Sequence, residues 1–147
     1  MVNLSLVKKK SNMGAVPILK KHTIYELLNG FLYKEELIPT SFLKAFIDSI
    51  GASQNTAAKL LGIATRTLQR ELNSTHLSSE LSDRFLQLMD LYKEGLEAFY
   101  DLDTFKQWLA TGKSAFHGKK PFELMHSITG IQQVKEEIIR TKLGILS

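Results

Sequence analysis

The most informative stretch of the sequence, residues 53–72, reads Ser53-Gln-Asn-Thr-Ala-Ala-Lys-Leu-Leu-Gly-Ile-Ala-Thr-Arg-Thr-Leu-Gln-Arg-Glu-Leu72. Ser53 can cap a first helix, and Gly62 allows the tight turn that ends it, because glycine enters left-handed conformations at little cost. Thr65 can cap a second helix, and the small side chains of Ala57 and Ala58 let that helix cross the first one closely. This order of features predicts a helix-turn-helix.

The second of these helices would present a polar stripe to solvent. Its members, spaced i, i+3, i+4 and i+7, are Arg66, Gln69, Arg70 and Asn73. Arginine can form two hydrogen bonds with guanine, and glutamine and asparagine can do the same with adenine. Thr67 and Lys59 are better placed for phosphates, which supply affinity without sequence information. We expect these residues to bind duplex DNA; the alternative is a solvated polar face on a helical hairpin of the core.

Helical periodicity recurs on both sides of this segment, and the alternation typical of half-buried strands does not occur. Thr23 and Glu26 have the spacing of a capping box, Asp103 can cap a later helix, and Pro121 suits the first turn of another. The apolar positions at helical spacing are Ile24, Leu27, Leu28 and Phe31; Phe42, Ala45, Phe46 and Ile50; Leu81, Phe85, Leu88, Tyr92, Leu96 and Phe99; Phe105, Trp108 and Leu109; Phe122, Leu124, Met125 and Ile128; and Ile131, Val134 and Ile138. The chain is therefore predicted to be all-α.

The charges of this 147-residue chain, +4 in total, are unevenly distributed. Residues 1–76 contain ten Lys/Arg and five Asp/Glu, whereas residues 77–147 contain nine and ten. A basic half joined to a near-neutral half suggests one part that binds a polyanion and one with another task; ordinary surface variation is the alternative. We expect a flexible basic arm over residues 1–22, a helical region with the helix-turn-helix over residues 23–76, and a second helical region over residues 77–147.

Several classes of function find no support in the residues. The chain has no cysteine, its four histidines share no metal-ligand spacing, and it carries no P-loop, GxGxxG, GxSxG or HExxH motif. We therefore expect no catalytic residues, no cofactor and no metal site. The longest charge-free run, residues 124–134, is eleven residues long, whereas a transmembrane helix needs about 18 apolar residues or more. The expected protein is soluble and cytoplasmic, with no membrane partner.

Two blocks of the sequence resemble the Xre/MbcA/ParS antitoxins. Residues 57–70 are similar to the helix-turn-helix of that family. The residues that resemble its toxin-binding domain are Phe105, Trp108, Leu109, Gly118, Lys119, Lys120, Pro121, Phe122, Leu124, Gly130, Val134, Ile138, Arg140 and Gly144. The resemblance covers roughly residues 40–147. Thr111-Gly112-Lys113 stands where such proteins often have a Pro-Asn pair.

The resemblance implies a bacterial type II antitoxin that is encoded beside a RES-domain toxin, an enzyme that consumes NAD⁺. Such antitoxins bind the toxin through the C-terminal domain, cover its active site and repress their shared promoter. The C-terminal end then lies in the mouth of the NAD⁺ cleft, so the expected toxin-binding residues are Arg140, Lys142, Leu143, Gly144, Ile145 and Leu146. The alternative is that the last apolar residues fold back against Ile138 or Phe122.

Two further hypotheses concern whether the chain forms a homodimer and whether it is a transcription regulator instead of an antitoxin. The apolar stripe from Leu81 to Phe99 is consistent with a helix that spans a subunit interface, and an intrachain core partner is the alternative. A homodimer would suit operator DNA, because two recognition helices can read half-sites about one helical turn apart. The rival to an antitoxin is a dimeric helix-turn-helix transcription regulator whose C-terminal half binds an effector or only dimerises.

Overall fold

The computed structural model describes residues 19–144, and over this range the chain is all-α, as predicted. The helices are α2 (Lys21–Tyr33), α3 (Thr40–Ile50), α4 (Gln54–Leu61), α5 (Thr65–Leu72), α6 (Ser79–Phe99), α7 (Leu102–Leu109), α8 (Pro121–Leu124) and α9 (Ile128–Lys142), with a 3₁₀ turn, η3, at Ser114–Phe116. Among the described residues, β-type pairing is limited to an isolated bridge between Pro39 and His76. None of the helices described here is long and apolar enough to cross a membrane.

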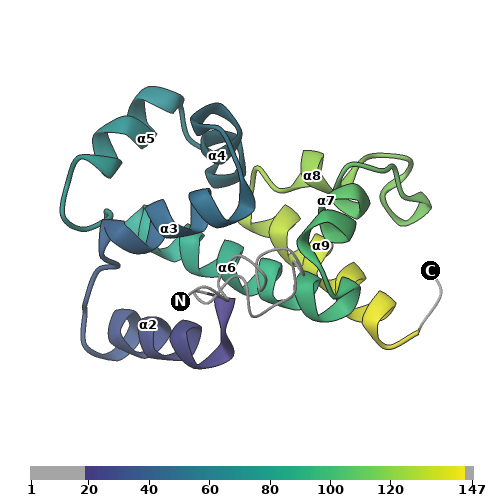
Figure 1. Cartoon of the computed structure of the whole chain (residues 1–147), viewed down its shortest axis with the longest axis horizontal. Helices are drawn as coiled ribbons and strands as arrows, with labels where there is room; N and C mark the ends of the chain where they lie inside the picture. Colours follow the sequence, from purple (N-terminus) through teal and green to yellow (C-terminus); the bar gives the residue numbers. More distant parts are fainter. Residues whose placement is uncertain (1–18, 145–147) are drawn as a thin grey trace, which may run out of the picture.

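Helix α6 is the centre of the core, and α2, α4, α7 and α9 pack around it. Figure 1 shows α6 running through the middle of the molecule, with α3 to α5 gathered toward one end and α7 to α9 toward the other. Its buried hydrophobic residues are Leu81, Phe85, Leu86, Leu88, Met89, Leu91, Tyr92 and Leu96. Because the predicted stripe is buried within the chain, the core alternative is confirmed, and the stripe gives no support for a subunit interface.

An aromatic cluster joins the helix-turn-helix region to the C-terminal helices. The ring of Phe46 on α3 lies 5.5 Å from that of Phe85 and 5.2 Å from that of Tyr92, both on α6. Tyr92 in turn meets Phe105 of α7 edge-on at 5.2 Å between ring centroids. Such pairs contribute about 0.5–1.5 kcal/mol each beyond the area that they bury. The two halves of the chain therefore share one continuous core.

The local signals within the helix-turn-helix are largely confirmed. The hydroxyl of Ser53 accepts a hydrogen bond from the Thr56 N–H and caps α4, and Gly62 ends that helix with φ +69°. Thr65 was expected to cap α5, and this expectation is wrong. The capping position is Ala64, and Thr65 is the first helical residue because its hydroxyl is engaged elsewhere, donating to Asn55 Oδ1 at 2.8 Å.

Two other predicted caps are also displaced. The capping box at Thr23 is wrong, since α2 begins at Lys21 and the residue before it has no side-chain cap bond. Leu19 is buried, so the chain docks on the core before the predicted start. Asp103 lies in the first turn of α7, and Asp101 caps that helix by accepting from the Thr104 N–H at 2.7 Å. Both aspartates satisfy the same sequence rule, and the direction in which the chain leaves α6 decides between them.

Two apolar stripes were assigned partly to the wrong residues. On α3, Ala45 is exposed, and Leu43 and Ile47 are buried instead. Ile128 belongs to α9 and not to the helix that starts at Pro121, because Ser127 caps α9 by accepting from the Gly130 N–H. Of the predicted flexible arm, residues 1–18 lie outside the described residues, and its end belongs to α2.

Candidate functional site

Helix α5 presents the predicted polar stripe on its exposed side. Arg66, Gln69 and Arg70 are exposed, whereas Leu68 is fully buried and holds the helix on the core. Asn73 is also exposed but lies just beyond α5, where it is the C-terminal capping residue. The structure therefore brings three of the four stripe residues together on one helix face, with the fourth at the end of that helix.

The two residues predicted for phosphate contacts are placed differently. Lys59 is exposed on α4, as the prediction requires. Thr67 is half-buried and lines, together with Arg70 of the stripe, a hollow of about 310 Å³ between α5 and the start of α6.

Two residues at the start of α4 lie beside the stripe and were missed by the sequence analysis. The side-chain amide of Gln69 donates to Gln54 Oε1 at 3.2 Å, and Asn55 accepts from the Thr65 hydroxyl. These bonds tie the amino-terminal end of α4 to the stripe-bearing helix and orient Gln69. The contacts join residues 15 and 10 positions apart, so the helical spacing of α5 alone carried no signal for them.

The side chain of Arg84, on α6, packs against the turn between α4 and α5. Its Nε and Nη2 groups are buried and have no hydrogen-bond partner among the described residues, and burial lowers its pKa. The guanidinium packs against Gly62, where an added Cβ atom would lie 2.6 Å from Nη2 and 2.9 Å from the His126 carbonyl oxygen. Gly62 is therefore needed for its lack of a side chain as well as for its left-handed backbone.

Helices α6 and α9 run parallel, side by side. Their polar contacts advance together along both helices: Gln132 bonds to Gln87 at 2.9 Å, Lys135 pairs with Asp90, and Lys142 pairs with residues further along α6. Parallel helices in register reach their carboxyl ends at the same end of the molecule. The last turns of α6 and α9 are therefore neighbours.

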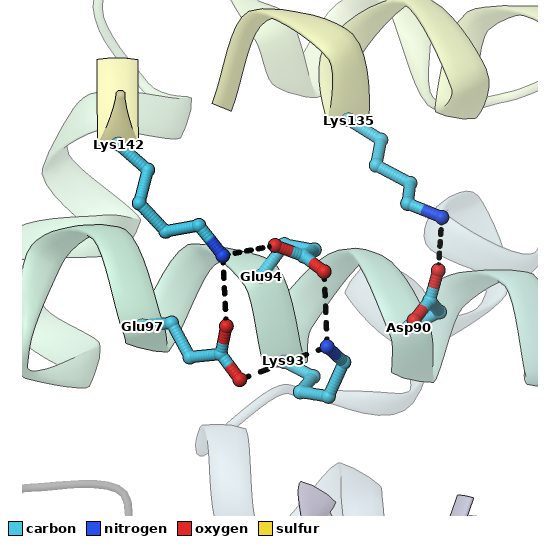
Figure 2. Close-up of polar contacts among 6 residues, drawn as sticks. All are labelled: Asp90, Lys93, Glu94, Glu97, Lys135 and Lys142. Carbon is cyan, nitrogen blue, oxygen red and sulfur yellow. Dashed lines mark hydrogen bonds and ion pairs between the residues drawn. The ribbon is translucent and has the colours of Figure 1, made fainter. Parts of the chain in front are cut away.

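A cluster of four charged side chains fixes these last turns to each other (Figure 2). Lys142 Nζ lies 2.7 Å from Glu94 Oε1 and 2.9 Å from Glu97 Oε1. Lys93 contacts the other oxygens of the same two carboxylates, at 2.9 and 3.6 Å. We call these residues, Lys93, Glu94, Glu97 and Lys142, the α6–α9 ion cluster.

The ionisation of this cluster follows from its contacts. Burial disfavours the charge of Glu94, but hydrogen bonds from Lys142 and Lys93 outweigh it and hold the pKa of Glu94 below its ordinary value. Hydrogen bonds to Glu94 and Glu97 raise the pKa of Lys142. Burial opposes the charge of Lys93 as well, yet its contacts with Glu94 and nearby carboxylates raise its pKa overall. The two lysines and Glu94 are therefore charged at neutral pH.

The other residues predicted to bind a toxin lie at or beyond this end. Arg140, Leu143 and Gly144 are at least partly exposed, and Ile145 and Leu146 lie outside the described residues. Lys142 is held by two carboxylates of its own chain, which makes it an anchor of α9 in the free protein. No group of three or more potential metal ligands occurs within residues 19–144.

Comparisons with known proteins agree with this arrangement. The model of the Antitoxin Xre-like helix-turn-helix domain matches residues 35–90, and that of the Antitoxin Xre/MbcA/ParS C-terminal toxin-binding domain matches residues 95–144. A search among curated proteins found no match. The first match contains α3 to α5 and the second contains α7 to α9, so the two expected parts occur in the expected order. The chain belongs to the Xre/MbcA/ParS-type antitoxins.

Proposed function

We propose that this antitoxin neutralises a RES-domain toxin that consumes NAD⁺ by covering its active site with the carboxyl end of the chain. The observation that carries the proposal is the exposure of Leu143 and Gly144 directly after a helix whose Ile138 is fully buried and whose Lys142 is anchored to α6. A rigid helix that ends in an exposed apolar residue is pre-ordered for insertion into a cleft, so little conformational entropy is lost on binding.

The proposed toxin-binding residues fall into two groups. Those that contact the toxin are Arg140, Leu143, Gly144, Ile145 and Leu146. Lys142 completes the predicted set, and we assign it mainly to holding α9 in place. Burial of each apolar residue of the tail in the cleft would contribute about 1.5–3 kcal/mol.

Two truncations test this assignment under co-expression with the toxin, with cell growth and cellular NAD⁺ as readouts. A chain that ends at Gly144 keeps the α6–α9 ion cluster and loses only the last three residues, whereas a chain that ends at Thr141 loses Lys142 as well. We expect both to fold and to bind operator DNA, and both to fail to rescue growth. Full rescue by the chain that ends at Gly144 would contradict the role of the tail.

We further propose that the protein represses its own operon as a cytoplasmic homodimer. The exposed side chains on and after α5, Arg66, Gln69, Arg70 and Asn73, would read bases in the major groove, and Lys59 and Thr67 would contact phosphates. A dimer would place two copies of α5 about one turn of DNA apart. Analytical ultracentrifugation with and without operator DNA tests the stoichiometry, and a monomer bound to a single half-site would contradict the dimer.

The same experiments separate the two activities. Arg66→Ala should weaken operator binding and retain toxin rescue, whereas the chain that ends at Gly144 should bind the operator normally and fail to rescue. The rival hypothesis, a transcription regulator with an effector-binding C-terminal half, predicts no rescue by any variant. The match to a toxin-binding domain over residues 95–144 favours the antitoxin.

A further inference from the structure

Six large hydrophobic side chains are exposed in the described part of the chain, and they form two groups. Tyr25, Leu32, Tyr33 and Leu37 lie on α2 and the loop after it, outside or at the edge of both matched domains. Tyr100 and Leu143 are 78% and 67% exposed and lie within the segment matched by the toxin-binding domain. The second group has two members, and they follow two different helices, α6 and α9.

Tyr100 and Leu143 lie at the same end of the molecule. Tyr100 directly follows α6, and Leu143 directly follows α9. The pairing of Lys142 with Glu97 joins the last turns of these parallel helices, as Figure 2 shows. Glu97 precedes Tyr100 by three residues, a rise of about 4.5 Å along a helix. Each of the two exposed side chains therefore lies within three residues of this ion pair, at the same end of the molecule.

The left-handed backbone of Tyr100 ends α6 and turns the chain toward α7, a role that glycine would fill with less strain. Its φ is +71° and its ψ is −24°, in the left-handed region that bulky residues rarely adopt and where glycine is the usual residue after a helix. The one bond that closes the helix here runs from the Tyr100 N–H to the Leu96 carbonyl, and any residue other than proline would provide it. With its ring 78% exposed, burial of the ring does not offset the strain. Strain of this kind is typical of functional positions.

We propose that Tyr100 is the anchor residue of a second contact surface for the toxin, which it forms together with Leu143 of the set proposed above. The inference rests on the proposed function, since it takes the carboxyl end of α9 to face the toxin. Tyrosine is enriched among residues that dominate interface affinity, because it combines a rigid apolar ring with one polar group. The partner surface that fits it is an apolar recess with a hydrogen-bonding group for the phenol oxygen.

The test is the affinity of full-length variants for the cognate toxin, purified in a catalytically inactive form, measured by isothermal titration calorimetry. Tyr100→Gly should raise the thermal unfolding temperature, because glycine relieves the strain, and should weaken toxin binding at least tenfold. Leu143→Ala should weaken binding about threefold to tenfold. Tyr33→Ala is the matched control, since Tyr33 is equally exposed at 78% but lies at the end of α2, and its affinity should equal that of the wild type.

The outcomes distinguish this inference from the proposed function. If the wild-type protein fails to bind the toxin, the proposed function is wrong and this inference is lost with it. If the wild type binds and Tyr100→Gly binds equally well, only the second contact surface is overturned. An equal loss of affinity in Tyr33→Ala would also overturn it, because the effect would then not be specific to this end of the molecule. A more stable Tyr100→Gly protein that binds weakly is the result that supports it.

Discussion

Helices α5 and α9 carry the residues that we propose to bind DNA and toxin, and they expose these residues in different ways. Helix α5 buries only Leu68 and presents a whole side to solvent. Helix α9 buries Gly130, Ile131, Val134, Glu137 and Ile138. Residues along its opposite side, such as Gln133 and Glu136, are exposed, but the residues proposed to contact the toxin lie at and beyond its carboxyl end. A side-on contact surface depends on the rotation of one helix, whereas an end-on surface depends on where neighbouring helices stop. The end-on surface is therefore sensitive to how α9 packs against its neighbouring helices.

The largest effect should come from a substitution that disturbs the packing of α9 against the end of α8. Gly130 lies in the first turn of α9, where an added Cβ atom would overlap the backbone carbonyl oxygen of Leu124. Because a backbone atom cannot turn aside as a side chain can, Gly130→Ala should destabilise the protein by about 3 kcal/mol. Urea denaturation measures this, and growth rescue should be lost. Wild-type stability would show that the end of α8 shifts freely and that α9 is not rigidly seated.

A smaller loss is expected when the turn before α5 is disturbed. Gly62→Ala places a Cβ atom against Arg84 and the His126 carbonyl, at φ +69°, and should cost about 2 kcal/mol and weaken operator binding. Gly118→Ala is the control, because Gly118 has φ +87° and open space around it. It should cost about 1 kcal/mol, from the backbone conformation alone. Equal costs at the two positions would mean that Arg84 does not support the turn.

The exposed side of α5 can be altered without loss of stability. Arg66→Ala and Arg70→Ala should each weaken specific DNA binding by about 1–3 kcal/mol, the value of a lost bidentate contact with guanine. Circular dichroism and the unfolding temperature should match the wild type, because both residues are exposed. Arg140→Ala removes an arginine from α9 and should leave operator binding unchanged. Gel shifts at a fixed salt concentration measure the affinity of each variant for operator DNA. Equal affinities of all three variants would exclude α5 as the helix that recognises the bases.

The smallest effect should come from the α6–α9 ion cluster. Lys142 is 32% exposed, so Lys142→Met should cost only about 0.5–1 kcal/mol at pH 7. The lowered pKa of Glu94 gives the sign of the pH dependence: its contribution to stability is present above the unfolded pKa of about 4.3 and is lost as the pH falls through the folded value. The stability difference between variant and wild type should therefore shrink below about pH 4. A difference that does not change between about pH 3 and pH 7 would show that Glu94 and Lys142 are not coupled.

Most of the candidate DNA-binding surface could be predicted from the sequence because its signals are local. Ser53, Gly62 and the spacing of Arg66, Gln69 and Arg70 all depend on the conformation of adjacent residues or on the rotation of one helix. The exceptions were the residues with partners elsewhere. Thr65 lost its expected capping role to a bond with Asn55, and Gln54 entered the surface through its bond with Gln69.

At the other end of the molecule, the apolar spacing of Ile131, Val134 and Ile138 was enough to predict a helix with a buried side, and all three are fully buried. The spacing contained no information on which helix would cover that side or in which direction it would run. The parallel packing of α6 and α9 depends on contacts between residues 45 and 48 positions apart, such as Lys142 with Glu97 and Glu94. The same packing places Tyr100 and Leu143, which follow these two helices, at one end of the molecule. Local propensity acts over a few residues, so helix formation and amphipathicity follow from the sequence, whereas the pairing of distant helices emerges only when the whole core is packed.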